Sequence, residues 1–193
     1  QRMCRIFEPY HLVWIEEPLD AYDHEGHAAL AAQFDTPIAT GEMLTSAAEH
    51  GELIRHRAAD VLMPDAPRVG GITQMLKIMA LADHARLRMA PHFAMEIHLH
   101  LAAAYPHGPW VEHFEWLEPM FNERLAIADG RMVVPNRPGL GFSLSEQAAR
   151  WADECSAMLR VRQSSRLFRL RSAAEVGAAL TFQNTGPAQI PGL

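Results

Sequence analysis

Six ionisable residues recur along the first 112 positions, at intervals that suit a shared chemistry. They are Glu16, Glu17, Glu42, Asp65, His92 and Glu112. Counted from Glu16, the four later positions follow at steps of 26, 23, 27 and 20 residues. One strand, its following helix and their loops in a parallel barrel occupy about that length. The spacing therefore predicts that these side chains, distant in sequence, meet at one edge of a sheet.

The residue types in this series define the chemistry that such a meeting point would support. Two or three carboxylates around one point suit Mg²⁺, a hard cation that prefers oxygen ligands. A histidine beside an aspartate suits a general base, because the carboxylate fixes the ring's tautomer and stabilises its cation. A further glutamate opposite can hydrogen-bond a developing oxyanion. Together they fit abstraction of a proton next to a carboxylate, with the metal stabilising the enediolate.

Each member of the series, taken alone, has a simpler interpretation. Glu16 and Glu17 could stand at the start of a helix. Glu42 and Asp65 could lie in solvated loops. His92 is one of eleven histidines and could be a loop residue with ordinary partners. The shared interval, rather than any single residue, favours the functional interpretation.

Other histidines give a weaker signal. His98 and His100 look like a metal-binding pair, but residues two apart on a helix face different directions, and no acidic residue is well placed beside them. The remaining ones are expected at the surface or behind the site: His11, His24, His27, His107 and His113.

Short strands and longer helices are expected to alternate around these residues. Strands are predicted at 12–15, 37–40, 61–63, 88–90 and 110–111, and helices at 25–34, 46–56, 72–84 and 94–104. This alternation indicates βαβ units and a parallel sheet. The predicted fold class is α/β: a partial (β/α) barrel of the TIM type, with about five βα units in residues 1–128.

The sequence changes character from Asp129 onward. Asp129-Gly130 is a turn signal between two short strands, and residues 143–158 have a helical pattern. Residues 129–158 are therefore expected to form a hairpin and a helix that close the fold. The tail, residues 159–193, ends in Gly and Pro and is predicted to be poorly ordered. Its arginines are interpreted as a solvated basic stretch rather than a binding patch.

Composition narrows the classes of function. The chain has 193 residues, 49% of them hydrophobic and 21% charged, as is ordinary for a soluble globular domain. A net charge of -6 provides no broad basic surface, so nucleic acid and anionic membranes are poor partners. No apolar run approaches the ~20 residues of a membrane span. Cys4 and Cys155 form no Cys-x-x-Cys pair, and free thiols in a cytoplasmic protein are expected.

Four motifs occur in order: Trp14-Ile15-Glu16-Glu17-Pro18, Thr40-Gly41-Glu42, Pro64-Asp65-Ala66-Pro67-Arg68-Val69-Gly70-Gly71 and Ala90-Pro91-His92-Phe93. With these motifs the chain resembles the mandelate racemase group of the enolase superfamily from about residue 8 to 154. Further stretches, among them Glu112-His113-Phe114-Glu115-Trp116, are similar to the acid-sugar dehydratases of the galactarate and L-talarate type.

The resemblance implies catalytic roles for three residues. Asp65 and His92 would form the Asp-His pair of the group, and Glu112 would stabilise the enediolate. In the dehydratases a hydroxyl β to the carboxylate then leaves, and protonated His92 suits the donation of a proton to it. The implied substrate is a small aldarate or sugar acid, and the intact parent is expected to be a homo-oligomer.

The resemblance also implies a metal site that this sequence holds in part. Glu16 and Glu42 match two of the three Mg²⁺ ligands, with Glu17 behind them. The group's capping domain, Lys-x-Lys motif and first ligand Asp precede the point where this sequence begins, and Lys77 lies in a predicted helix. We therefore expect the chain alone to be inactive. A racemase or epimerase, another sugar-acid dehydratase, or a non-catalytic remnant of such an enzyme remain alternatives.

Overall fold

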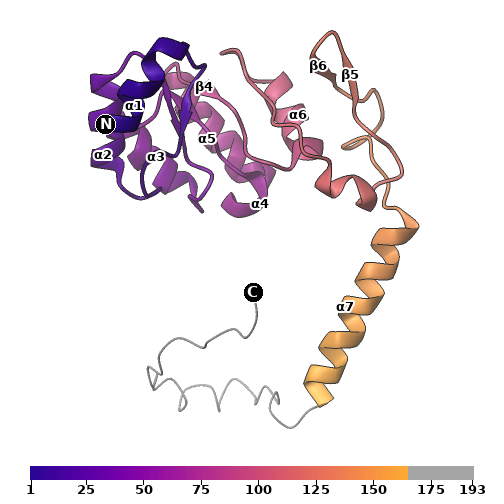
Figure 1. Cartoon of the computed structure of the whole chain (residues 1–193). Coiled ribbons are helices and arrows are strands. Elements are labelled where there is room, and N and C mark those ends of the chain that lie inside the picture. Colours follow the sequence, from indigo (N-terminus) through magenta and orange to yellow (C-terminus); the bar gives the residue numbers. More distant parts are fainter. Residues whose placement is uncertain (165–193) are drawn as a thin grey trace. The chain divides into compact units, whose positions relative to one another are not determined.

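A parallel sheet is the centre of the first of two units. The computed structural model describes residues 1–164 (Figure 1). The chain divides into two units, Gln1–Glu146 and Gln147–Leu193. The strands are β1 (Ile15–Glu16), β2 (Ile38–Thr40), β3 (Val61–Leu62) and β4 (Arg88–Met89). They pair in the order β1-β2-β3-β4, and every pair is parallel. The parallel sheet expected from the alternating pattern is therefore present.

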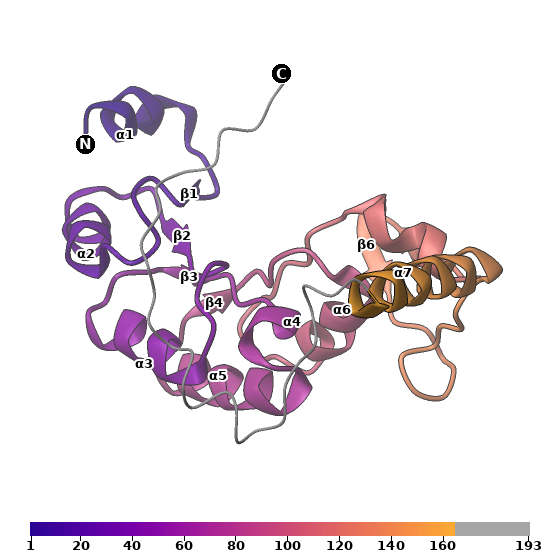
Figure 2. The ribbon, with the colours of Figure 1, turned by 90° about the horizontal axis from the view of Figure 1, so that it is seen from below.

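Helices follow the strands as the sequence predicts. They are α2 (His24–Gln33), α3 (Ala47–Arg55), α4 (Ala66–Val69), α5 (Ile72–His84) and α6 (Met95–Ala103), with α1 (Arg2–Phe7) and the 3-10 helix η1 (Glu8–Tyr10) ahead of β1. Figure 2 shows α2, α3 and α5 along one side of the curved row of strands. The short helix α4 had not been expected between β3 and α5.

Local sequence explains where these helices begin and which face they bury. Asp23, Ser46 and Asp65 precede α2, α3 and α4, and each side chain accepts a hydrogen bond from a backbone amide of the first turn. Along α5, apolar residues at three-and-four spacing are buried: Met75, Ile78, Met79 and Ala82. They pack with Leu53 of α3 and Leu62 of β3 in the main core.

The predicted fifth strand was wrong. Trp110 donates its backbone N–H to the Met89 carbonyl at 2.9 Å, so the chain passes beside β4. No strand forms there in residues 1–164, and Pro109, which has no N–H, immediately precedes this contact. The sheet described here therefore has four strands instead of the five that the partial-barrel prediction required.

The segment after the sheet contains a hairpin and a long helix. Strands β5 (Ala126–Ala128) and β6 (Arg131–Val133) pair antiparallel. Asp129 and Gly130 both have positive φ, as a two-residue hairpin turn requires, and the turn signal is confirmed. A 3-10 helix, η2 (Glu115–Met120), precedes the hairpin, and α7 (Glu146–Ser164) runs past the predicted end at residue 158. Most of the tail expected to be poorly ordered lies outside the described residues.

Both cysteines lie within the described residues. Cys4 is buried, Cys155 is exposed, and both are free thiols, as predicted. Among residues 1–164, no helix is long and apolar enough to cross a membrane.

Candidate active site

The strand ends bring the candidate residues to one edge of the sheet. Glu16 is the last residue of β1, and Glu42 follows β2 by two residues. Asp65 and His92 each follow their strand, β3 and β4, by three residues. Because the strands are parallel neighbours, their carboxyl ends share one edge, where barrels of this type carry their active sites.

His92 is the point at which three of these residues meet. Its Nδ1 lies 2.9 Å from Asp65 Oδ2, and its Nε2 lies 3.6 Å from Glu42 Oε2. The side chain of Asp65 is 5% exposed, whereas those of His92 and Glu42 keep about a fifth of their surface exposed, at 21% and 22%. An ionised carboxylate can only accept, so the proton of a neutral His92 ring stands on Nδ1. Nε2, the nitrogen without a proton, then lies on the side of the ring that faces Glu42.

Asp65 is held from two directions. Its Oδ1 accepts the backbone N–H of Arg68 at 2.9 Å and so caps α4, while Oδ2 is left for His92. The Arg68 guanidinium also approaches Oδ2, at 3.8 Å. The aspartate therefore has a fixed orientation before any ligand binds.

Glu42 stands in a negatively charged environment. Burial raises the pKa of its carboxyl group, and the neighbouring charges of Glu17 and Glu16 raise it further. His92 and, more weakly, Arg68 act in the opposite direction. Glu42 is thus close enough to Glu16 and Glu17 to be repelled by their charges, and a bound cation would relieve this repulsion.

Glu16 and Glu17 have different partners although they are adjacent. Glu16 Oε2 accepts the indole N–H of Trp14 at 3.1 Å. Glu17 Oε1 accepts the Thr40 hydroxyl at 3.0 Å and the Gly41 amide at 3.3 Å. Glu17 has a φ of 35°, in the left-handed region. Its carboxylate therefore ties the end of β1 to the end of β2, one residue before Glu42.

Glu112 reaches the site through the residue that follows His92. Its Oε2 accepts the backbone N–H of Phe93 at 2.6 Å, and Phe93 has a left-handed φ of 62°. Glu112 and Glu16 also line the same cavity of about 170 Å³, together with Trp14, Met63, Ala90, Trp110 and Val111. The structure gives no direct contact between Glu112 and His92.

The described residues fit Mg²⁺ in chemical type but hold an incomplete ligand set. Glu16 and Glu42 offer the oxygen donors that Mg²⁺ prefers. The pKa of Glu42 is raised mainly by burial, and the charges of Glu17 and Glu16 add to this effect. Within residues 1–164, however, no three His, Cys, Asp or Glu side chains are grouped so that they could hold a metal ion. Any metal site formed with these two residues needs a further ligand.

Sequence reasoning missed the role of His98 and of an aromatic cluster. His98 is fully buried, and its Nε2 accepts the Ala66 amide, whereas His100 Nε2 lies 2.9 Å from the Leu140 carbonyl oxygen. These histidines therefore have different partners. The aromatic cluster consists of Phe93, Phe114 and Trp116, with ring centroids 4.8 to 5.9 Å apart. A polar residue inside the apolar run of α6 was the signal for a buried histidine.

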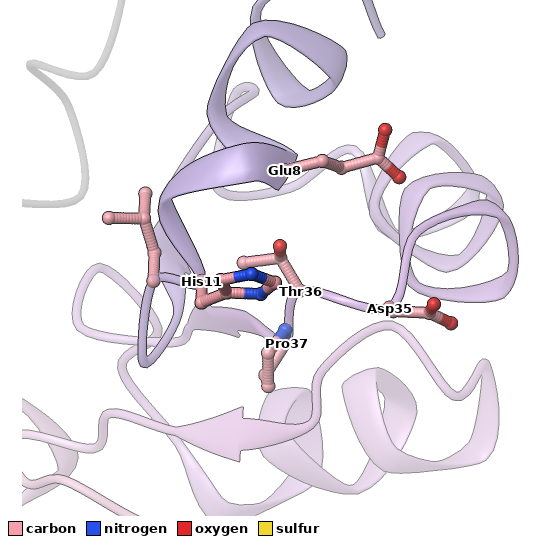
Figure 3. Close-up of a pocket in the computed structure, with 6 residues that line it drawn as sticks. Glu8, His11, Asp35, Thr36 and Pro37 are labelled. Carbon is pink, nitrogen blue, oxygen red and sulfur yellow. The ribbon is translucent and has the colours of Figure 1, made fainter.

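A larger cavity, of about 370 Å³, lies elsewhere in the first unit. It is lined by Glu8, His11, Leu12, Asp35, Thr36 and Pro37. Figure 3 shows these side chains around it, with the Asp35 carboxylate directed away from His11. Pro37 immediately precedes β2, so this cavity is at the amino end of the strand. It is therefore distinct from the site at the carboxyl ends.

The fold and the strand-end residues are those of a known class. The chain belongs to the enolase C-terminal domain-like family, whose model matches residues 1–148. A second model, the C-terminal region of pullulanase-type alpha-1,6-glucosidases, matches residues 143–193. The first match ends before the predicted tail, and most of the second falls outside the described residues.

Individual relatives are dehydratases. The L-talarate/galactarate dehydratase of Salmonella typhimurium is 66% identical over 150 residues, which are 78% of this chain and 38% of that protein. The crystal structure of L-talarate dehydratase from Polaromonas sp. JS666, complexed with Mg and L-glucarate, matches with a TM-score of 0.77 and 81% identity, over 78% of this chain and 42% of that chain. The D-xylonate dehydratase of Haloferax volcanii is 31% identical over 157 residues, covering 77% of this chain and 38% of that protein. The chain thus spans about two fifths of the length of these relatives.

Proposed function

We propose that this chain carries the base-bearing part of a Mg²⁺-dependent acid-sugar dehydratase of the galactarate and L-talarate type. The reaction removes the proton α to a carboxylate and eliminates the β-hydroxyl as water. The observation that carries the proposal is the contact of His92 with both Asp65 and Glu42. The high identity to proteins named L-talarate dehydratases supports the substrate class.

His92 acts as the base and then as the acid. With Nδ1–H held by Asp65, the lone pair on Nε2 accepts the α-proton, and the carboxylate stabilises the resulting imidazolium. The electron pair left on the substrate then expels the β-hydroxyl, which takes the proton back from Nε2 and departs as water. One proton and one hydroxide leave, so the products are an enol, which becomes the keto-deoxy acid, and water.

The other carboxylates support this sequence of proton transfers. Glu16 and Glu42 would hold Mg²⁺ with a further ligand, and Glu17 keeps Glu42's loop in place through Thr40 and Gly41. When bound, Mg²⁺ supplies positive charge that stabilises the negative charge developing on the substrate carboxylate. Glu112, beside Phe93, would stabilise that charge by donating a hydrogen bond, which requires a proton on its carboxyl group.

A chimera tests the proposal. Residues 1–148 would replace the matching segment of the Polaromonas L-talarate dehydratase, which is 81% identical in the region of similarity. We expect water loss from galactarate or L-talarate with Mg²⁺ present, and none in a matched His92→Asn chimera. Mass spectrometry of the products in D₂O would report water loss and α-proton exchange separately.

The same assay distinguishes the alternatives. Exchange or inversion at the α-carbon without water loss would replace the proposal with a racemase or epimerase. Dehydration of other sugar acids alone would change the substrate class. A folded chimera with Mg²⁺ bound but no turnover would support a non-catalytic remnant.

A further inference from the structure

A buried histidine with no role in the proposed reaction lies directly behind the catalytic pair. His98 belongs to α6 and is 0% exposed. Its Nε2 accepts the backbone N–H of Ala66 at 2.9 Å, a contact that spans 32 residues of sequence. Ala66 is itself 1% exposed, so water cannot accept a hydrogen bond from its amide. An unpaired amide at this depth would be costly, and His98 is the partner that prevents it.

The position of the Ala66 amide gives this contact its importance. Ala66 directly follows Asp65 and is the first residue of α4. The first amides of a helix have no partner within the helix and need outside acceptors. Asp65 Oδ1 accepts a hydrogen bond from the Arg68 amide, and His98 Nε2 accepts one from the Ala66 amide. Oδ2 of Asp65 is thereby left for His92.

The ring of His98 can serve as an acceptor only in one form. An amide donates, so Nε2 must carry no proton, and in a neutral ring the proton stands on Nδ1. Burial lowers the pKa of His98 to about 4, with His92 acting in the same direction and Asp65 and the Phe93 backbone opposing it. At neutral pH the ring is therefore uncharged and in the form that accepts.

We propose that His98 is a positioning residue for the Asp65–His92 pair. By anchoring the Ala66 amide, its Nε2 fixes the start of α4 and keeps Asp65 Oδ2 directed at His92 Nδ1. The inference rests on the proposed function, because the pair it positions is the proposed catalytic pair. A histidine that merely fills space in the core would contribute stability but would leave the pair unaffected when replaced by an apolar residue.

The first experiment is ¹⁵N NMR of the imidazole rings in the full chain at pH 7. We expect His98 with a protonated Nδ1, a bare Nε2 and a coupling across the hydrogen bond to the Ala66 amide. A protonated Nε2, or a cationic ring, would overturn the proposal. This measurement needs no variant, so it holds even where a substitution prevents folding.

The second experiment compares two substitutions of His98 with a matched control. His98→Gln keeps an acceptor, and His98→Leu removes it. His27→Leu is the control, because His27 of α2 is equally buried and its Nδ1 lies 2.9 Å from the Asp23 carbonyl, away from the pair. The readouts are hydrogen exchange at the Ala66 amide, corrected for global stability, and the tautomer of His92.

The expected pattern separates positioning from packing. In His98→Leu, Ala66 should exchange roughly fivefold faster or more, and His92 should lose its preference for Nδ1–H. His98→Gln should restore both towards the original values, and His27→Leu should leave both unchanged. The proposal fails if His98→Leu leaves the His92 tautomer unchanged, or if His27→Leu alters it equally.

Failure of this inference can be told apart from failure of the proposed function. The NMR readouts need neither substrate nor Mg²⁺, so they stand even where the chimera does not dehydrate a sugar acid. In an active chimera, His98→Leu should lower kcat with little change in KM, because the base would be misaligned while substrate contacts remain. An unchanged kcat in folded protein would contradict the positioning role and leave the dehydratase assignment intact.

Discussion

Asp65 Oδ2 and His92 Nδ1 lie 2.9 Å apart although 27 residues separate them in sequence. The contact joins the loops after two adjacent parallel strands, β3 and β4. The other oxygen of Asp65 caps α4, so the carboxylate cannot rotate away without losing that cap. The fold therefore sets the orientation of the imidazole before a substrate arrives.

The first prediction concerns the two members of this pair. In the chimera, His92→Asn should lower kcat by roughly 10²–10⁴-fold, because the amide cannot take up the α-proton. Mg²⁺ affinity and melting temperature should stay near the original values, since His92 is not proposed as a ligand. Asp65→Asn should lower kcat by a smaller factor.

Rate and melting temperature must be measured on the same samples of both variants. If His92 were only a packed loop residue, stability would fall while turnover per folded molecule was preserved. Normal turnover in folded His92→Asn would remove it from the mechanism.

The second prediction concerns the metal. The chain alone should bind Mg²⁺ weakly, because Glu16 and Glu42 form no three-residue group in the described part of the chain and affinity rises with ligand number. Isothermal calorimetry should give no micromolar binding, and Glu42→Gln in the chimera should weaken binding further. Micromolar affinity for the isolated chain would show that this chain itself supplies a further Mg²⁺ ligand besides Glu16 and Glu42.

The third prediction is a dependence of stability on pH from His98. Its folded pKa is about 4, below the value of 6.5 expected unfolded. Between these values the unfolded chain binds more protons, so the free energy of unfolding falls as pH drops from about 6.5 to 4. The difference of about 2.5 pKa units corresponds to about 3 kcal/mol, fully present above pH 6.5.

Urea unfolding at several pH values would measure this dependence. His98→Leu should flatten the slope between pH 6.5 and 4, because the titrating group is gone. Any change in overall stability that does not depend on pH is read from the free energy of unfolding at pH 7. A slope unchanged by the substitution would mean that other groups produce it.

The fourth prediction concerns the tail. Deleting residues 159–193 should change the free energy of unfolding of Gln1–Glu146 by less than about 1 kcal/mol, because the tail's sequence lacks a consistent apolar face. Thermal unfolding of the shortened chain beside the full chain would measure the change. A loss of several kcal/mol would show that the tail is part of the fold.

The sequence was sufficient to predict the elements whose pattern is local. The bounds of α5 coincide with the predicted 72–84, because its buried residues follow the helical period closely. The hairpin turn at Asp129-Gly130 was predicted because the two residues accept positive φ. The contact of Asp65 with His92 was also predicted, since parallel neighbouring strands bring their carboxyl ends together.

Other features depend on contacts that one sequence does not display. Whether Trp110 and Val111 form a strand depends on a ladder with β4, and only the Trp110 amide reaches it. The role of His98 depends on the Ala66 amide, a backbone group that every sequence carries and that no motif marks. The left-handed φ of Phe93, which directs its N–H to Glu112, has no glycine to signal it.

The position of β1 at the margin of the sheet affects the tendency of the chain to self-associate. β1 pairs with β2 on one side, and no other strand of residues 1–164 joins it. A strand margin without a paired strand offers backbone groups to an extended peptide, and so favours self-association. The carboxylate of Glu16 at this margin and the net charge of -6 oppose stacking of identical copies. The tendency of the chain to self-associate therefore depends on a balance between the unpaired backbone groups of β1, which can bind another strand, and the electrostatic repulsion between copies.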